Sequence, residues 1–139
     1  MPVSTAIFWP VIVQVFLTFA IYLLMMKRRF GAVRSGMAKA HDYKIPIIEP
    51  APSATVARSL INQFELPVLF YVVCIALYVT AGAGMPVLVL AWIFVVSRLL
   101  HAFVHVTSNR LMFRQRLFSV GVIAVVALWT LFAVHIALQ

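Results

Sequence analysis

Four long apolar stretches restrict this chain to a membrane. They cover approximately residues 4–26, 56–81, 85–106 and 117–138, and the first of them contains no charged residue. A helix of about 20 residues, rising about 1.5 Å per residue, crosses a hydrocarbon core of about 30 Å. Lipid offers no partner for an unpaired backbone group, so each stretch is expected to be helical. The sequence therefore predicts one domain, an all-α integral membrane bundle of four transmembrane helices.

Composition excludes a water-soluble domain. The chain is 65% hydrophobic and only 10% charged, whereas a soluble domain carries about 25% charged residues. A chain with so few charged residues does not have enough of them to cover a water-facing protein surface. No basic residue precedes the first stretch and no A-x-A site closes it, so we expect a membrane span there and not a cleaved signal peptide.

The basic residues lie in two of the connecting segments, and this distribution predicts the orientation. The first segment carries Lys27, Arg28, Arg29, Arg34, Lys39 and Lys44, and the second carries Arg110, Arg114 and Arg116. The positive-inside rule then puts both basic segments in the cytoplasm and both termini outside it. Because this charge borders the spans and has no domain of its own, it favours contact with anionic membrane lipids over nucleic acid.

Residues 27–55 form the only long polar segment, which we expect to be a cytoplasmic loop. Its second half reads Ile45-Pro46-Ile47-Ile48-Glu49-Pro50-Ala51-Pro52. Proline disfavours helical backbone at the residue before it. This half of the loop is therefore predicted to be extended.

Polar residues at membrane depth are costly, so their positions point to function. In the second helix, Arg58, Asn62 and Glu65 are spaced i, i+4, i+7 and fall within an arc of about 60°. In the third helix, Arg98-x-x-His101-x-x-x-His105 shares one face in the same way.

These two faces are expected to meet at one depth. Measured from the cytoplasmic side, Glu65 lies about 10 Å in, Arg98 about 13 Å and His101 about 9 Å. We therefore predict a polar cavity that opens to the cytoplasm and binds a ligand. The alternative is a buried Glu65–Arg98 ion pair that only joins the two helices, since removing one partner of such a pair costs about 3–5 kcal/mol.

A metal or haem site is the second interpretation of the histidines. His101 and His105, at i and i+4, are spaced to hold a metal, or one of them a haem. No cysteine or second carboxylate completes the set, while His135 lies at the far end of the fourth helix and His41 in a loop. The single cysteine, Cys74, is expected to be a core residue of the second helix. We therefore predict no metal site.

The polar motifs resemble those of the MAPEG family, the membrane-associated proteins of eicosanoid and glutathione metabolism. The resemblance rests on Arg58-x-x-x-Asn62-x-x-Glu65-x-Pro67, on Arg98-x-x-His101-x-x-x-His105 and on the basic turn from Arg110 to Arg116. Size, four-helix topology and orientation agree along the whole chain. The strings NQFELPVLFY (62–71) and HVTSNR (105–110) are similar to a bacterial branch of the family. This resemblance implies a bacterial inner membrane.

The resemblance implies a homotrimer that binds glutathione, as co-substrate, between neighbouring protomers. It implies that Glu65 receives the ammonium group, while Arg58, Asn62 and Arg98 hold carboxylates or order the site. His101 matches a position that contacts the tripeptide, and His105 is expected to line the same site. A cation of the basic turn, Arg114 before Arg116 or Arg110, is expected to stabilise the thiolate.

The function implied is that of a glutathione-dependent transferase or peroxidase acting on lipophilic electrophiles from the bilayer. Two positions depart from the family pattern. Ile61 stands where glutathione-using members tend to carry arginine, and His105 stands where a tyrosine is common. Both changes remove glutathione contacts. The alternative is therefore a non-catalytic subunit of a larger membrane complex or a lipid-binding accessory protein.

Overall fold

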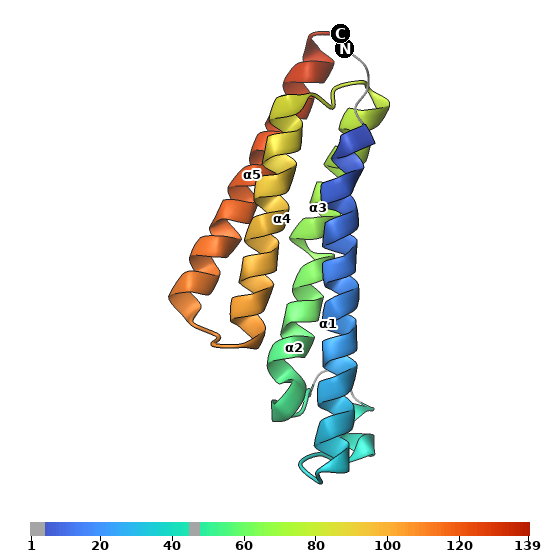
Figure 1. Ribbon diagram of the computed structural model, residues 1–139, viewed down its shortest axis with the longest axis vertical. Coiled ribbons are helices and arrows are strands. Elements are labelled where there is room, and N and C mark those ends of the chain that lie inside the picture. The colour runs from blue at the N-terminus through green and yellow to red at the C-terminus, as the bar shows by residue number, and fades with distance from the viewer. Residues whose placement is uncertain (1–4, 45–47) are drawn as a thin grey trace.

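The computed structural model describes residues 5–44 and 48–139, and within them the chain is a bundle of long helices without strands (Figure 1). The elements are η1 (Thr5–Ile7), α1 (Phe8–Arg34), η2 (Ala40–Tyr43), α2 (Ala51–Ile61), η3 (Asn62–Phe64), α3 (Leu66–Val79), α4 (Met85–Val106) and α5 (Leu111–Ala137). Four segments are long and apolar enough to cross a membrane, namely Thr5–Arg34, Ala51–Val79, Met85–Val106 and Leu111–Ala137. The predicted all-α fold with four membrane-spanning helices is confirmed.

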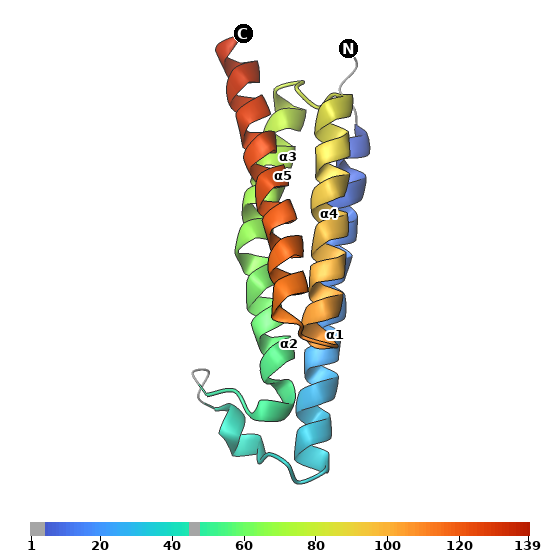
Figure 2. The same cartoon turned by 90° about the vertical axis from the view of Figure 1, so that its left-hand side faces the viewer.

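Neighbouring spans run in opposite directions, so the two basic connections lie at one end of the bundle. Figure 1 and Figure 2 show η1 and the end of α5 at the opposite end, beside the short turn between α3 and α4. The connection after α1 extends further along the bundle than the turn between α4 and α5. The charge asymmetry of the sequence is therefore also an asymmetry in space.

The helix bounds differ from the predicted ones mainly at the basic end. The span predicted at 85–106 is α4, Met85–Val106. By contrast, α1 continues to Arg34, beyond the predicted residue 26, and α5 begins at Leu111 and not at 117. Leucine, methionine and arginine are good helix formers, so these helices continue past their apolar cores into the polar boundary.

The proline-rich half of the first connection is only partly extended. Residues 45–47 lie outside the described residues. Pro50 has the extended values φ −56° and ψ 143°, but α2 already begins at Ala51 and contains Pro52. The prediction of extended backbone was therefore wrong at Ala51 and Pro52. Proline is tolerated in the first turn of a helix because its missing N–H has no intrahelical partner there.

The second span is interrupted where a single helix was predicted. Between α2 and α3 lie η3 and Glu65, whose φ of −97° and ψ of −102° leave the helical region. Pro67 explains the break, because it lacks an N–H and its ring clashes with the carbonyl group of the residue four positions earlier, Gln63. The sequence places Arg58, Asn62 and Glu65 on one helical face, but they lie in α2, in η3 and in the break before α3, respectively.

A buried polar pair ties this interruption to α1. Gln14 Nε2 donates a hydrogen bond of 2.9 Å to Gln63 Oε1, and Gln63 Nε2 donates one of 3.2 Å to the Ser59 carbonyl oxygen. On the α3 side, Phe70 and Phe94 stack with ring centroids 4.3 Å apart. Cys74 is buried in the same apolar cluster, as predicted for a core residue.

Candidate functional site

A pocket of about 470 Å³ opens where the interrupted second span meets α4 and α5. It is lined by Asn62, His101, Arg114, Gln115, Phe118 and Ser119. Three of these residues, Asn62, His101 and Arg114, were predicted from the sequence to belong to the site. The fold therefore brings together predicted residues from three separate elements.

His101 joins α4 to the first turn of α5. Its Nδ1 lies 3.0 Å from the main-chain oxygen of Arg114. A carbonyl oxygen only accepts, so Nδ1 carries the hydrogen and donates it. The Nε2 atom of the same ring is buried and has no partner among the described residues. One nitrogen of His101 thus joins the two helices, and the other is free to accept a hydrogen bond.

Arg98 lies behind the pocket wall and is fully buried, with 0% exposure. Its Nη2 donates a long hydrogen bond of 3.4 Å to the carbonyl oxygen of Asn62, and its Cζ lies 5.5 Å from the centroid of the Phe118 ring. Its Nε and Nη1 atoms have no partner in the described part of the chain. Buried polar groups are normally hydrogen-bonded, so two unpaired donors on one buried side chain are unusual.

His105 extends this group of buried nitrogen atoms toward the end of α4. Its ring packs edge-on against His101, with centroids 5.7 Å apart. Its Nδ1 is buried and is likewise unpaired within the described residues. Arg98, His101 and His105 therefore keep the common face that their spacing predicted, since α4 is a continuous helix.

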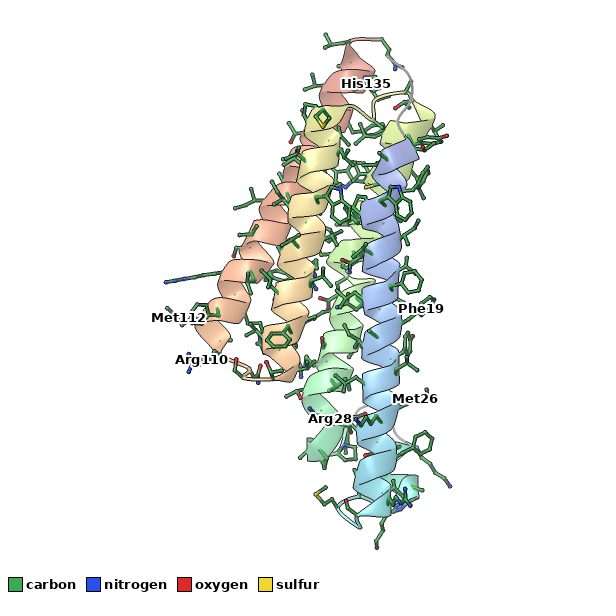
Figure 3. The ribbon with its side chains drawn as sticks, in the orientation of Figure 1. Phe19, Met26, Arg28, Arg110, Met112 and His135 are labelled. Atoms are coloured by element: carbon green, nitrogen blue, oxygen red, sulfur yellow. The ribbon has the colours of Figure 1, made fainter. Side chains whose placement is uncertain are left out.

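Arg114 is the one of the three basic-turn arginines that lines the pocket. Its Nη1 donates a hydrogen bond of 2.7 Å to Asn109 Oδ1. Asn109 has a φ of 47°, a left-handed conformation that asparagine tolerates better than most residues. Arg110 and Arg116 are exposed, and Figure 3 shows Arg110 beside Met112 at the outer edge of the turn.

Helices α4 and α5 approach closely at Gly121, next to the Arg98 side chain. At Gly121 a Cβ atom would lie 3.0 Å from Ser97 Oγ and 3.5 Å from Arg98 Cδ. Small residues at helix contacts let backbones approach closely in membranes. Gly121 thus leaves room for the Arg98 side chain beside α5.

Arg58 and Glu65 do not line the pocket, and both are exposed in the single chain. No ion pair within 4.0 Å joins Glu65 to Arg98 among the described residues, so the alternative of a buried pair between the two is wrong. The predicted arc assumed one continuous helix. The break at Glu65 removes that periodicity and leaves the carboxylate at the surface.

Three pocket residues were missed by the sequence analysis, namely Gln115, Phe118 and Ser119. All three lie on α5, which begins six residues before the predicted residue 117, at Leu111. With the correct start, Phe118 follows Arg114 by one helical turn and faces the same side. The sequence signal that could have identified these pocket residues was therefore the helix-forming composition of residues 111–116.

Across the described residues, no group of three or more histidine, cysteine, aspartate or glutamate side chains is arranged to hold a metal ion. His135 lies at the opposite end of the bundle, where its Nε2 is 2.8 Å from the Thr80 carbonyl oxygen. Figure 3 shows this separation from the turn that carries Arg110. His101 and His105 are therefore the only histidines near the pocket in this part of the structure.

Comparison with known proteins assigns the chain to a family. The family model described as MAPEG family matches residues 7–134, which is nearly the whole chain and includes every residue that lines the pocket. No curated protein and no solved structure matches the chain. The four apolar helices and this match together show an integral membrane protein, and the chain belongs to the MAPEG family.

Proposed function

We propose that the pocket binds glutathione as co-substrate and that the protein is a glutathione-dependent transferase or peroxidase acting on lipophilic electrophiles. The observation that carries this proposal is the set of buried, unpartnered nitrogen atoms on Arg98, His101 and His105. Glutathione carries two carboxylates, which accept hydrogen bonds from the free N–H groups of Arg98, and peptide N–H groups, which donate to the Nε2 atom of His101. Arginine binds carboxylates through two parallel hydrogen bonds. Membership of the MAPEG family supports the same ligand class.

Arg114 is the residue we assign to the thiol. A neighbouring cation lowers the pKa of a thiol and so raises the fraction present as the nucleophilic thiolate. The thiol proton leaves to solvent, sulfur bonds to the electrophilic carbon, and the electron pair of the broken bond departs with the leaving group. Arg114 suits this role because it lines the pocket while Asn109 holds its Nη1.

A homotrimer is the assembly we propose, with glutathione between neighbouring protomers. Glu65 supports this assembly, because its carboxylate is exposed within a candidate membrane span. A charged side chain at membrane depth is costly unless protein or a water-filled cavity covers it. A neighbouring protomer provides that cover, with Glu65 receiving the ammonium group and Arg58 a carboxylate. On the charge asymmetry we place both termini outside the cytoplasm, and on the resemblance to a bacterial branch of the family we propose a bacterial inner membrane.

Glutathione binding to the detergent-purified protein tests this proposal. A ligand that binds only the folded state, at 100 times its dissociation constant, stabilises it by about 2.7 kcal/mol. We expect the wild type to show this thermal shift and Arg98→Ala and Glu65→Gln to lose it. Arg116→Gln removes an exposed charge that does not line the pocket and serves as the control. Light scattering checks that the trimer persists in each variant, and an unchanged shift in both site variants contradicts the proposal.

The second candidate function is a non-catalytic subunit or lipid-binding accessory protein of a larger membrane complex. The observation that favours it is Ile61, which is 58% exposed at the end of α2 and offers no charge to a carboxylate. Native membrane extraction followed by mass spectrometry distinguishes the two functions. A stoichiometric larger partner favours the second, whereas an isolated assembly of three 15.6 kDa chains favours the first.

A further inference from the structure

Three consecutive basic residues near the end of α1 have different surroundings. Arg29 makes two hydrogen bonds to the Glu49 carboxylate, of 2.9 and 2.6 Å. Lys27 and Arg28 are exposed, and neither forms an ion pair with a carboxylate of the described residues. One of the three charges is therefore neutralised within the chain, while two are left for another partner.

Lys27 and Arg28 line a groove between α1 and the start of α2, with a volume of about 820 Å³. Leu24 and Pro52 supply apolar walls, and no acidic side chain lines the groove. A Cβ atom at Gly31 would meet nothing within 4 Å, so the groove has open space above this residue. The groove thus combines two unpaired cations, Lys27 and Arg28, with apolar walls and open space above Gly31.

The groove lies at the depth of lipid headgroups. Arg28 follows Phe8, the first residue of α1, by twenty residues, which is about 30 Å of helix and the thickness of a hydrocarbon core. Figure 3 labels Arg28 on the side of α1 that faces α2, and Met26 on the opposite side. Lysine and arginine at such a depth extend their charged ends toward the headgroups while their stems cover apolar surface.

The start of α2 adds a further favourable field. Ala51 and Pro52 line the groove, and α2 has neither a side-chain cap nor an acidic residue in its first turn. The amino-terminal end of a helix carries partial positive charge, which favours an anion. The Glu49 carboxylate accepts a hydrogen bond from Ser53 Oγ in this first turn and offsets part of that field. The two cations and the depth of the groove are therefore the stronger indications of an anionic ligand.

We propose that this groove is a binding site for one anionic phospholipid, with the headgroup phosphate between Lys27 and Arg28 and an acyl chain against Leu24. Non-specific attraction of anionic lipids to the protein depends only on its positive charge. Binding of one lipid in the groove also depends on the open space above Gly31. The proposal is independent of glutathione binding, because no residue of the groove lines the pocket of Asn62, His101 and Arg114.

Native mass spectrometry of the purified protein with added phosphatidylglycerol tests the site, with phosphatidylcholine as the neutral lipid. We expect the wild type to retain phosphatidylglycerol preferentially. The double variant Lys27→Gln/Arg28→Gln should bind it roughly 30-fold more weakly, since each cation near the surface contributes about a fivefold factor. The matched control is Arg110→Gln/Arg116→Gln, which removes the same charge from the other basic connection. Equal losses in the two double variants would show attraction by net charge alone and overturn the proposal.

Gly31→Leu fills the groove without changing charge, and we expect it to weaken phosphatidylglycerol retention as well. Full retention in Gly31→Leu would place the lipid on the open surface and contradict the groove. Inorganic phosphate and phosphatidylglycerol share the phosphate group, so a tenfold excess of inorganic phosphate is added in a separate sample. Displacement of the lipid by phosphate would assign the site to a soluble anion and overturn the lipid assignment.

Discussion

The imidazole of His101 and the main-chain oxygen of Arg114 are joined by a hydrogen bond of 3.0 Å that links α4 to the first turn of α5. The same imidazole keeps a buried, unpartnered Nε2 near the pocket. His101 therefore has two roles that reside on two different atoms. The two roles can be separated by substitutions that keep a polar atom at only one of the two nitrogen positions of His101.

We predict that His101→Asn and His101→Gln fail in different ways. Asparagine places a donor near Nδ1 and keeps the bond to the Arg114 oxygen, so the thermal midpoint should stay close to wild type while the glutathione shift is lost. Glutamine places its amide near Nε2 and leaves the Arg114 oxygen without its side-chain partner, which costs about 1–3 kcal/mol. Thermal unfolding with and without glutathione measures both effects. Identical behaviour of the two variants would refute the division of roles.

The bond between Gln14 and Gln63 should give a measurable coupling energy. Both side chains are buried, at 0% and 2% exposure. Hydrogen bonds between membrane helices contribute about 0.6 kcal/mol on average and about 1.7 kcal/mol at most. We expect a favourable coupling in this range from Gln14→Leu, Gln63→Leu and the double variant, read by unfolding in mixed micelles. Strictly additive effects would mean that the pair does not stabilise the fold.

Gly121→Ala should be destabilising by about 1–3 kcal/mol, because the added Cβ meets Ser97 Oγ at 3.0 Å. Ser97 Oγ is held by a bond of 2.7 Å to the Phe94 carbonyl oxygen and does not yield freely. The double variant Gly121→Ala/Ser97→Ala should recover much of the loss. Gly31→Ala, where a Cβ meets nothing within 4 Å, is the control. A loss as large in Gly31→Ala would assign the effect to glycine replacement in general.

The Glu49 carboxylate makes the α1–α2 connection sensitive to acid. Burial works to raise the pKa of Glu49, but hydrogen bonds from Arg29 and Ser53 outweigh it and hold the pKa below the ordinary 4.5. A lowered pKa means that the stabilising interaction is fully present above 4.5 and is lost as the pH falls through the lower, folded-state value. We expect the difference in thermal midpoint between wild type and Glu49→Gln to shrink below pH 4.5. A difference that is constant across that range would contradict the assignment.

The face of α4 could be predicted from sequence because nothing interrupts that helix. Arg98, His101 and His105 keep the i, i+3, i+7 relation, and all three are buried. The corresponding argument failed for Glu65, because periodicity carries no information across a break in the backbone. Pro67 signalled that break, but not the direction in which Glu65 would then point.

Tertiary contacts decided the rest of the site. The pairing of His101 with the Arg114 carbonyl group depends on where α5 begins, and an apolar-window argument starts that helix at its hydrophobic core. Gln14 offered a clearer signal, as the only amide side chain in residues 4–26. A buried amide in a membrane span needs a partner, but the sequence does not say that the partner is Gln63.

The interrupted second span has a consequence for biogenesis. A continuous apolar helix satisfies its own backbone and can enter the bilayer as an independent unit before it packs. The segment around Asn62 and Gln63 is not self-sufficient in this sense, since α4 supplies Arg98 to the Asn62 carbonyl oxygen and α1 supplies Gln14 to the Gln63 side chain. We expect this span to settle at its final depth only after the first and third spans have been inserted.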